Sequence, residues 1–367
     1  MKKILVVGQT PPPYHGQAMM INRLVKASFK KIKIYHIRMS YSENFKKIGR
    51  VNLKKITHLI ELVIKTYYFR FKYGINTLYY PPAGPNRAPI LRDIIFLFLI
   101  RPLFRETIFH FRAAGISEYL ERSDIFLRYF AKMVYNKPRI SIQLSNKNPA
   151  DGNYFNSNKV LIIPNGIEDD NINPIEDEIS EQINLLSIGV IQKSKGIEDL
   201  LEALNLLNKK NVFLNILGEF ISKDYECFIK EKISNMKNSD NIFFHGTKIN
   251  EEKNAFFKKS DVLCFPTFYE SESFGNVLLE AMMFSLPVVA TDWRGIPDIV
   301  IENTTGFLVP INSPIKIAEK LKILIENREL SKQMGKNGRK RYEEMYTIDK
   351  HLNNMEKMFC DEFDLHK

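Results

Sequence analysis

Short apolar runs recur along the whole chain, at intervals that leave room for a helix between most successive pairs. In the first half they occupy residues 3–8, 32–37, 77–80, 107–111, 139–144 and 160–163. In the second half they occupy residues 184–188, 212–217, 242–244, 262–265, 288–291 and 307–309. Continuous apolar runs of this length predict strands that are buried on both faces of a parallel sheet.

Helical patterns occupy several of the segments between these runs. Residues 18–29 form an amphipathic stretch, and longer helical patterns cover residues 51–73 and 88–98. Strands that alternate with helices predict an α/β chain. Two such series predict two Rossmann-like domains, residues 1–165 and 166–347, joined by the polar, Asn- and acid-rich segment that begins at Pro164. Because open α/β sheets bind ligands at the carboxyl ends of their strands, we expect the site in a cleft between two facing sheets.

Length and cysteine content narrow the class of protein. A chain of 367 residues suits two domains of ordinary size. Its three cysteines are widely spaced and odd in number, which favours a reducing compartment over a disulfide framework or a metal set. The N-terminal apolar run is too short for a signal peptide, and the longest apolar stretch, residues 94–100, cannot span a bilayer. We therefore expect a cytoplasmic protein.

Charge is divided unevenly between the two halves. Residues 1–165 hold 28 Lys+Arg against 8 Asp+Glu, a net charge of +20, whereas the rest of the chain carries −9, which together give +11. This asymmetry predicts that the first domain meets an anionic partner. The stretch from Asn44 to Lys72 is basic, aromatic-rich and helically patterned. It predicts contact with an anionic membrane surface, the alternative being a sheet-covering helix with a solvated basic face.

The most informative motif joins two carboxylates to a helix start. Glu272 follows the predicted strand 262–265, and seven residues separate it from Glu280. A helical pattern begins near Asn276, so Glu280 lies about one turn inside the helix while Glu272 stays in the loop. Free N–H groups at a helix N-terminus favour a phosphate, and carboxylates accept hydrogen bonds from sugar hydroxyls. The motif therefore predicts a nucleotide-sugar site.

The motif is followed by Leu286-Pro287-Val288-Val289-Ala290-Thr291 and by Gly306-Phe307-Leu308-Val309-Pro310. This ordered set resembles the retaining glycosyltransferases of family 4 (glycosyl transferases group 1). The resemblance implies the GT-B fold, with two Rossmann-like domains facing across a cleft and a last helix, residues 348–363, that crosses back to the first domain.

The same resemblance implies a metal-independent, hexosyltransferase-type enzyme. It would move a sugar from a UDP- or GDP-sugar, with retention, to a hydroxyl of a glycan or of a polyprenyl-diphosphate-linked acceptor. Bacterial surface-polysaccharide biosynthesis (capsule, O-antigen or exopolysaccharide) is the implied process, and the inner face of the cell membrane the implied location. In this mechanism Glu272 binds donor-sugar hydroxyls and Glu280 the ribose. The rest of the donor motif is Ser273, Phe274, Gly275 and Asn276, and the Phe274 and Gly275 amides with Lys195 stabilise the leaving diphosphate.

A second phosphate-binding candidate follows the strand 184–188. Gly189 opens a turn that contains Lys193 and Lys195 before a helical pattern resumes. The family usually has Gly-Arg here, but Val190 occupies the Arg position, and we expect Lys193 to supply a second cation. A solvated turn is the alternative interpretation.

The remaining candidates come from three strand ends. Gly16, in the loop after the first strand, allows close backbone approach to an anion. His110 resembles the family's histidine that contacts a donor-sugar hydroxyl, although the match can instead fall on Arg112 and a core histidine is the plainer interpretation. Gly246 and Thr247 are candidate contacts to the nucleotide base.

Metals and other functions complete the expectations. The sequence has no Asp-x-Asp motif and no ligand spacing among its histidines, so we expect no metal and no cofactor. The alternatives are a nucleotide-sugar epimerase on the same fold, a non-catalytic subunit, and a nucleic-acid-binding protein that uses the basic half. The last is disfavoured because no reader motif is present and the acidic half repels phosphate, so we expect no nucleic-acid partner.

Overall fold

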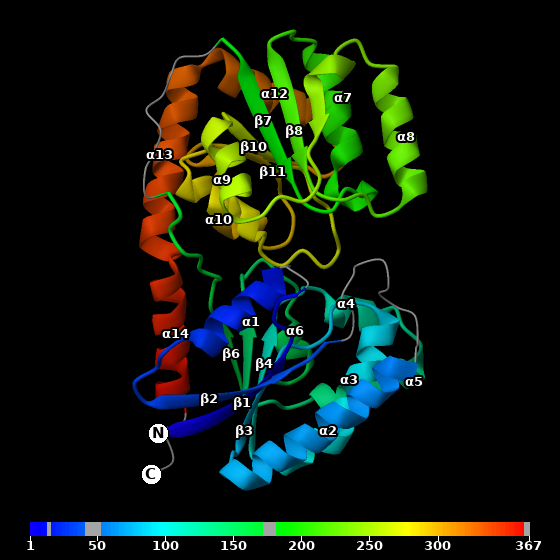
Figure 1. Ribbon diagram of the computed structural model, residues 1–367, viewed down its shortest axis with the longest axis vertical. Coiled ribbons are helices and arrows are strands. Elements are labelled where there is room, and N and C mark those ends of the chain that lie inside the picture. The colour runs from blue at the N-terminus through cyan, green and yellow to red at the C-terminus, as the bar shows by residue number, and fades with distance from the viewer. Residues whose placement is uncertain (13–15, 41–52, 172–180, 363–367) are drawn as a thin grey trace. The chain divides into compact units, whose positions relative to one another are not determined.

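The computed structural model describes residues 1–12, 16–40, 53–171 and 181–362. The chain divides into two compact units, Met1–Asn165 with Asp349–Lys367, and Gly166–Ile348. Each unit holds one six-stranded sheet covered by helices (Figure 1). The predicted α/β class with two Rossmann-like parallel sheets is confirmed. Parts of four predicted features lie outside the described residues: 13–15 of the first loop, 44–52 of the basic stretch, 172–180 of the linker and residue 363 of the last helix.

The sheet of the first unit has the strand order β2-β1-β3-β4-β5-β6, and all its pairings are parallel. Its strands are β1 (Lys2–Gly8), β2 (Ile32–Arg38), β3 (Thr77–Tyr80), β4 (Glu106–Phe111), β5 (Ile140–Gln143) and β6 (Lys159–Ile162). Its helices are α1 (Gly16–Lys26), α2 (Leu53–Tyr73), α3 (Arg87–Ile100), η2 (Arg101–Leu103), α4 (Ile116–Glu121), α5 (Ile125–Tyr135), α6 (Asp151–Tyr154) and α14 (Ile348–Asp361).

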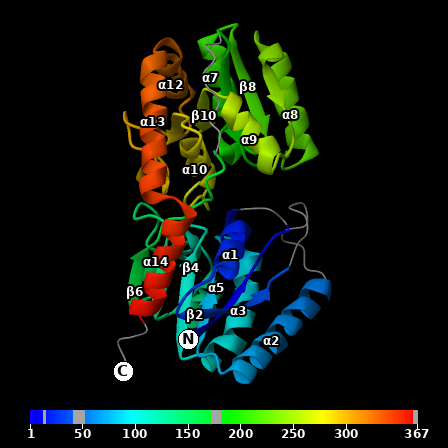
Figure 2. The same cartoon turned by 60° about the vertical axis from the view of Figure 1, so that its left-hand side comes forward.

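Alternate residues of β1 enter two different cores, because successive side chains of a strand point to opposite faces of the sheet. Leu5 and Val7 pack in a cluster with buried side chains of α2, α3 and α5. Ile4 and Val6 pack in another cluster with side chains of α1 and with Met355 of α14. The first unit is therefore a three-layer structure in which α2, α3 and α5 cover one face and α1 and α14 the other (Figure 2).

The sheet of the second unit has the order β12-β11-β10-β7-β8-β9 and is also parallel. Its strands are β7 (Ile183–Ile188), β8 (Val212–Leu217), β9 (Ile242–Phe244), β10 (Val262–Phe265), β11 (Val288–Thr291) and β12 (Gly306–Val309). Its helices are η3 (Lys193–Lys195), α7 (Ile197–Leu207), α8 (Lys223–Ser234), η4 (Ser239–Asn241), α9 (Asn250–Lys259), α10 (Asn276–Met283), α11 (Ile296–Ile299), α12 (Pro314–Glu326) and α13 (Arg328–Met345).

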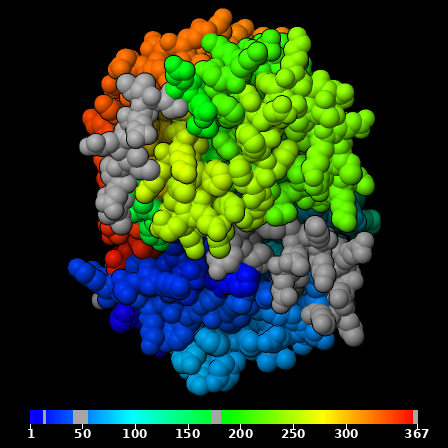
Figure 3. All heavy atoms as spheres, turned by 45° about the horizontal axis from the view of Figure 1, so that its top comes forward, coloured from blue at the N-terminus to red at the C-terminus, as the bar shows by residue number. Residues whose placement is uncertain are grey.

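Helices α7, α8 and α12 pack on one face of the second sheet, in a core built around Leu185, Leu214 and Leu321. Residues of α8 and α9 lie within the yellow-green part of the surface in Figure 3. The strand order places β7 and β10 side by side at the centre, with β8 next to β7. Their carboxyl ends lie at one edge of the sheet, so the loops after these three strands are neighbours.

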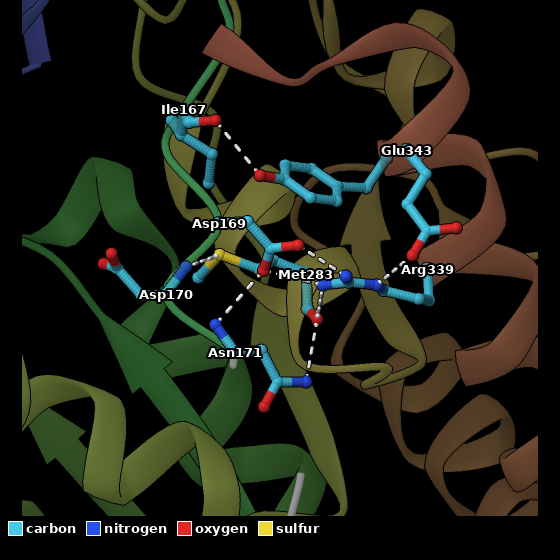
Figure 4. Close-up of polar contacts among 8 residues, drawn as sticks. Ile167, Asp169, Asp170, Asn171, Met283, Arg339 and Glu343 are labelled. Atoms are coloured by element: carbon cyan, nitrogen blue, oxygen red, sulfur yellow. Dashed lines mark hydrogen bonds and ion pairs between the residues drawn. The ribbon is translucent and has the colours of Figure 1, made fainter. Parts of the chain in front are cut away.

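The segment that enters the second unit, residues 167–171, is held by an ion pair and hydrogen bonds to α10 and α13 (Figure 4). Arg339 forms an ion pair with Asp169 and donates to the carbonyl of Met283 at 2.9 Å, and Tyr342 donates to the carbonyl of Ile167 at 3.0 Å. The Arg339 guanidinium lowers the pKa of Asp169. Asn171 also donates to the Met283 carbonyl, at 3.2 Å. At least one acid of the predicted linker is thus a structural residue of the second unit.

Candidate functional site

The loop after β7 depends on two glycines. Gly189 and Gly218, which follow β7 and β8, both have positive φ, of 149° and 147°. A Cβ on Gly218 would lie 1.8 Å from the carbonyl oxygen of Gly189, so no larger residue fits. The two strand ends therefore approach each other backbone to backbone, and this contact fixes the start of the loop that carries Lys193 and Lys195.

Lys195 lies directly beside Glu272. Its Nζ is 2.5 Å from Oε2 of Glu272, and the two side chains are 22% and 12% exposed. The ammonium also lies 4.7 Å from the centre of the Tyr269 ring, a cation–π contact. The structure therefore brings together two predicted site residues that are 77 positions apart in the sequence.

Glu280 has a lysine partner of its own. The Nζ of Lys253, on α9, donates to Oε1 of Glu280 at 2.6 Å, and both side chains are about a fifth to a quarter exposed (24% and 20%). Both carboxylates of the motif are thus paired with a partly exposed cation. Sequence reasoning missed Lys253, because nothing in the spacing of α9 and α10 indicates which of the lysines of α9 faces the carboxylate.

The start of α10 is a candidate site for an anion. Gly275, with φ of 80°, is its N-cap, and as a glycine it has no side chain to cap the first turn. Phe274 is buried and packs edge-on against Tyr346, which holds the turn before the helix. Ser273 is buried as well, and Asn276 is the first residue of the helix. The first-turn amides and the helix dipole therefore favour an anion at this end of α10.

A small pocket of about 20 Å³ lies at the carboxyl end of β7. Gly189, Val190 and Lys195 line it together with Phe265 and Pro266. Val190 stands here in place of the expected arginine, so the pocket wall is apolar at this position. Lys193 lies in the same loop and is exposed. Its charge opposes the rise in the pKa of Asp199, which burial and the neighbouring Glu198 cause.

Gly246 and Thr247 belong to the loop after β9, next to the end of β8. The carbonyl of Gly246 accepts a hydrogen bond from the Gly218 amide at 2.9 Å. The amide of Thr247 donates to Oε1 of Glu219 at 3.4 Å. Gly218 contacts this loop through Gly246, and it also lies against Gly189 at the start of the loop that carries Lys195. The predicted contact of Gly246 and Thr247 with a nucleotide base stays a prediction.

His110 is in the first unit, at the end of β4, and its side chain is fully buried. Its Nδ1 shares a hydrogen bond of 2.6 Å with the hydroxyl of Tyr79, whereas its Nε2 has no partner among the described residues. Burial and the nearby Arg112 and His351 lower the pKa of His110 well below its ordinary value. In this conformation His110 is a core residue. Arg112, the alternative match, is also buried, and donates to Asn165 and Tyr79.

Gly16 is the first residue of α1 and is exposed. The residues just before it, 13–15, lie outside the described residues, so its predicted approach to an anion stays a prediction. Among residues 1–12, 16–40, 53–171 and 181–362, no three His, Cys, Asp or Glu side chains are grouped as a metal would need. No helix in these ranges is long and apolar enough to cross a membrane.

Comparison with known proteins shows what the second unit resembles. Residues 168–341 match the family model described as glycosyl transferases group 1. The chain is 28% identical to the capsular polysaccharide biosynthesis glycosyltransferase CapM of Staphylococcus aureus over 227 residues, which is 56% of this chain and 57% of CapM. Relatives such as this one are matched over about half of their own length.

Solved structures match over nearly the whole chain. Sucrose-phosphate synthase from Thermosynechococcus elongatus has a TM-score of 0.78 at 18% identity and covers 99% of this chain and 100% of its own. Anabaena HepE in complex with UDP has a TM-score of 0.72 at 15% identity and covers 98% of this chain and 99% of its own. The chain thus has the GT-B fold of these proteins, and residues 168–341 of its second unit match the model of the glycosyl transferases group 1.

Proposed function

We propose that the protein is a retaining glycosyltransferase that moves a sugar from a UDP- or GDP-sugar to a hydroxyl of a glycan or lipid-linked acceptor. The observation that carries the proposal is the pairing of Glu272 with Lys195 and of Glu280 with Lys253 around the start of α10, whose N-cap is Gly275. Two carboxylates, two ammonium groups and a helix N-terminus at one sheet edge offer acceptors for sugar hydroxyls and donors for a diphosphate.

The Lys195–Glu272 pair supplies the donor-sugar subsite. A diphosphate carries more negative charge than one carboxylate, so it competes for the ammonium of Lys195 when the donor binds. Glu272 is then released to accept hydrogen bonds from donor-sugar hydroxyls. With Lys195 on the leaving diphosphate, and the amides of Phe274 and Gly275 beside it, the charge that develops as the glycosidic bond breaks is stabilised where it forms.

Glu280 supplies the ribose subsite. Lys253 binds Oε1 of Glu280, which fixes the carboxylate plane and leaves Oε2 as the oxygen that we assign to the ribose hydroxyls. Gly246 and Thr247, in the loop next to β8, are assigned to the base side of the nucleotide. We assign the diphosphate charge to the lysines and the α10 amides, without a metal ion.

The names of similar proteins and the charge of the first half of the chain support the substrates that we propose. CapM is named for capsular polysaccharide biosynthesis, and the HepE structure is titled as a complex with UDP, which supports a nucleotide sugar and a glycan as substrates. The net charge of +20 on residues 1–165 supports an acceptor held at an anionic membrane surface, on the cytoplasmic face. Bacterial surface polysaccharide is the product class we propose.

Calorimetric titration with UDP and GDP, followed by transfer assays with the matching sugar donors, tests the proposal. We expect Glu272→Gln and Glu280→Gln each to lower kcat/KM by about 10- to 100-fold, the loss of one charge-assisted hydrogen bond. Glu270→Gln, two positions from Glu272 and exposed, is the matched control and should be unchanged. Proton NMR of the product should show the donor's anomeric configuration, and EDTA should not inhibit. If neither UDP nor GDP binds, the proposal is overturned. Conversion of the donor in the absence of an acceptor would identify an epimerase instead.

A further inference from the structure

The first unit exposes apolar side chains on the helices that cover one face of its sheet. On α2 they are Ile56, Ile60, Ile64, Tyr67, Tyr68 and Phe71. Their spacing of three to four residues forms a second apolar stripe, because the helix already buries Leu62 against the sheet. An outward stripe of this kind offers an apolar surface to a partner. Helix α2 forms part of the outer surface of the first unit, light blue in Figure 3.

The stripe continues onto α3 and α5. Helix α3 packs against both α2 and α5, and the hydroxyl of Tyr67 donates to the carbonyl of Leu99 at 3.3 Å. The most exposed side chains here are Phe98 of α3, at 58%, and Ile125 and Phe126 of α5, at 72% and 73%. Together the three helices carry 15 of the 27 exposed large hydrophobic side chains of the described residues. A patch of this extent on one face of a unit is the mark of an interaction surface.

A basic groove of about 640 Å³ borders this apolar face. Phe98 and Met133, which belong to the apolar face, are among its apolar lining residues. Four cations line it, Arg101, Arg105, Lys137 and Arg139, against one acid, Glu106. Arg105 and Lys137 are exposed, and no hydrogen bond or ion pair engages their side chains among the described residues. The groove lies at the amino ends of β4 and β5, the opposite edge from the strand ends that carry His110.

The charges of the face identify its occupant. The sequences of α2, α3 and α5 contain nine Lys and Arg but only two acids, Glu61 and Asp93. Glu61 is 2.5 Å from Lys65, and Asp93 is buried and bonded to Tyr80 and Tyr135. A second copy of this chain would bring the same cations together across a symmetric interface, with no free acids to meet them. An anionic bilayer offers apolar depth and negative headgroups at once.

We propose that the outer face of α2, α3 and α5 docks on an anionic lipid bilayer and that the Arg105–Lys137 groove binds the phosphate of a lipid headgroup at its margin. The proposal extends the membrane association stated under the proposed function and names the surface responsible. It is separable from glycosyl transfer, because none of these side chains belongs to the nucleotide-sugar site.

Flotation of the full chain with vesicles tests this docking. We expect binding to phosphatidylglycerol–phosphatidylcholine vesicles, and at least a 10-fold loss for the variant Ile64→Ser with Phe126→Ser. The variant Arg105→Gln with Lys137→Gln should lose about five-fold for each cation, the equivalent of about 1 kcal/mol each, on anionic vesicles and nothing on pure phosphatidylcholine. Matched controls in the second unit are Ile315→Ser with Phe228→Ser, and Lys237→Gln with Lys340→Gln, all exposed positions.

Two further measurements keep the result decisive. Circular dichroism shows whether each variant is folded, and calorimetry with UDP shows whether it keeps its nucleotide site. Loss of UDP binding would contradict the proposed function, whereas loss of vesicle binding alone concerns only the docking. Sedimentation velocity reports the oligomeric state. If the face variants float as the wild type does, or if they convert a dimer to a monomer while lipid binding is unchanged, the proposal is overturned.

Discussion

The ammonium of Lys195 lies 2.5 Å from the carboxylate of Glu272, although the two residues come from loops after different strands of the second sheet. β7 and β10 are adjacent in that sheet, so their carboxyl ends place the two loops side by side. Each residue neutralises the other in the absence of substrate. In the proposed function, a donor that carries both a diphosphate and sugar hydroxyls would replace this single contact with two.

Replacement of Lys195 by Met should weaken UDP or GDP binding by about 10- to 100-fold, because one charge-assisted contact to the diphosphate is lost. Calorimetric titration measures the change. Lys209→Met breaks the Lys209–Glu326 pair on the surface of the second unit and is the matched control. Equal affinities of the wild type and Lys195→Met for the nucleotide would show that Lys195 does not bind the diphosphate.

Replacement of Lys253 by Met should affect nucleotides but not pyrophosphate. Without its partner, Glu280 is free to rotate and its carboxylate no longer presents one oxygen to the ribose. We expect about a three- to ten-fold loss of affinity for UDP, as for one hydrogen bond, and no change for inorganic pyrophosphate. A parallel loss for both ligands would show that Lys253 binds phosphate instead.

Gly218→Ala should destabilise the second unit by roughly 3 kcal/mol or more, because the new Cβ clashes with the Gly189 carbonyl and φ is positive. Gly74→Ala is the control: its φ of 62° is also positive, but a Cβ there meets no atom within 4 Å. That change should cost only about 1 kcal/mol. Urea unfolding followed by Trp293 fluorescence reports on the second unit for Gly218→Ala, and circular dichroism follows Gly74→Ala. Similar costs at the two sites would contradict the close backbone contact.

His110 and His351 should make the first unit less stable as the pH falls below about 6.5. Burial lowers the pKa of His110 far below its ordinary value and that of His351 to about 3, so the unfolded chain binds protons that the folded chain excludes. Each histidine then costs roughly 1 kcal/mol per pH unit between pH 6.5 and the folded-state value. Calorimetric melting of wild type and His110→Gln from pH 7 to 5 should show a smaller slope for the variant. Identical slopes would mean that His110 takes up protons in the folded state.

Cys264 should resist thiol reagents until the protein unfolds. It lies in β10, fully buried, and burial raises the pKa of its thiol to about 12. Cys227 is exposed and should react within the native protein. Titration with an aromatic disulfide that releases a coloured thiolate, before and after addition of denaturant, distinguishes the reactivity of Cys227 from that of Cys264. Rapid modification of Cys264 in the native state would show that the core of the second unit opens to solvent.

The strands could be predicted from the sequence because buried parallel strands are simply continuous apolar runs. All twelve lie within one residue of the predicted ends, for example residues 262–265 for β10 and 212–217 for β8. The helices α2 and α3 extend from Leu53 to Tyr73 and from Arg87 to Ile100, close to the predicted 51–73 and 88–98. Burial of an apolar run depends on its own composition, so local pattern is enough.

The pairings inside the site could not be predicted in the same way. The motif identified Glu272 and Glu280, but Lys253 and Tyr269 reach them through side-chain directions that only the packed loops determine. His110 shows the same limit, since the pattern places it at a strand end but does not say that Tyr79 and the core enclose it. The basic, aromatic-rich stretch could be predicted to meet a membrane, but which side chains of α2 face outward could not, because an apolar position in sequence looks the same whether it faces the sheet or the outside.

The first unit is assembled from both ends of the chain. Met355, Met358 and Phe359 of α14 complete the core that Ile4 and Val6 begin. During synthesis, therefore, this unit cannot close its core until residue 359 has left the ribosome, although β1 is made before the whole of the second unit. The second unit, Gly166–Ile348, is continuous and has all of its residues earlier. The order of folding is then the reverse of the order of synthesis, and the exposed apolar helices of the first unit emerge long before the unit that carries them is finished.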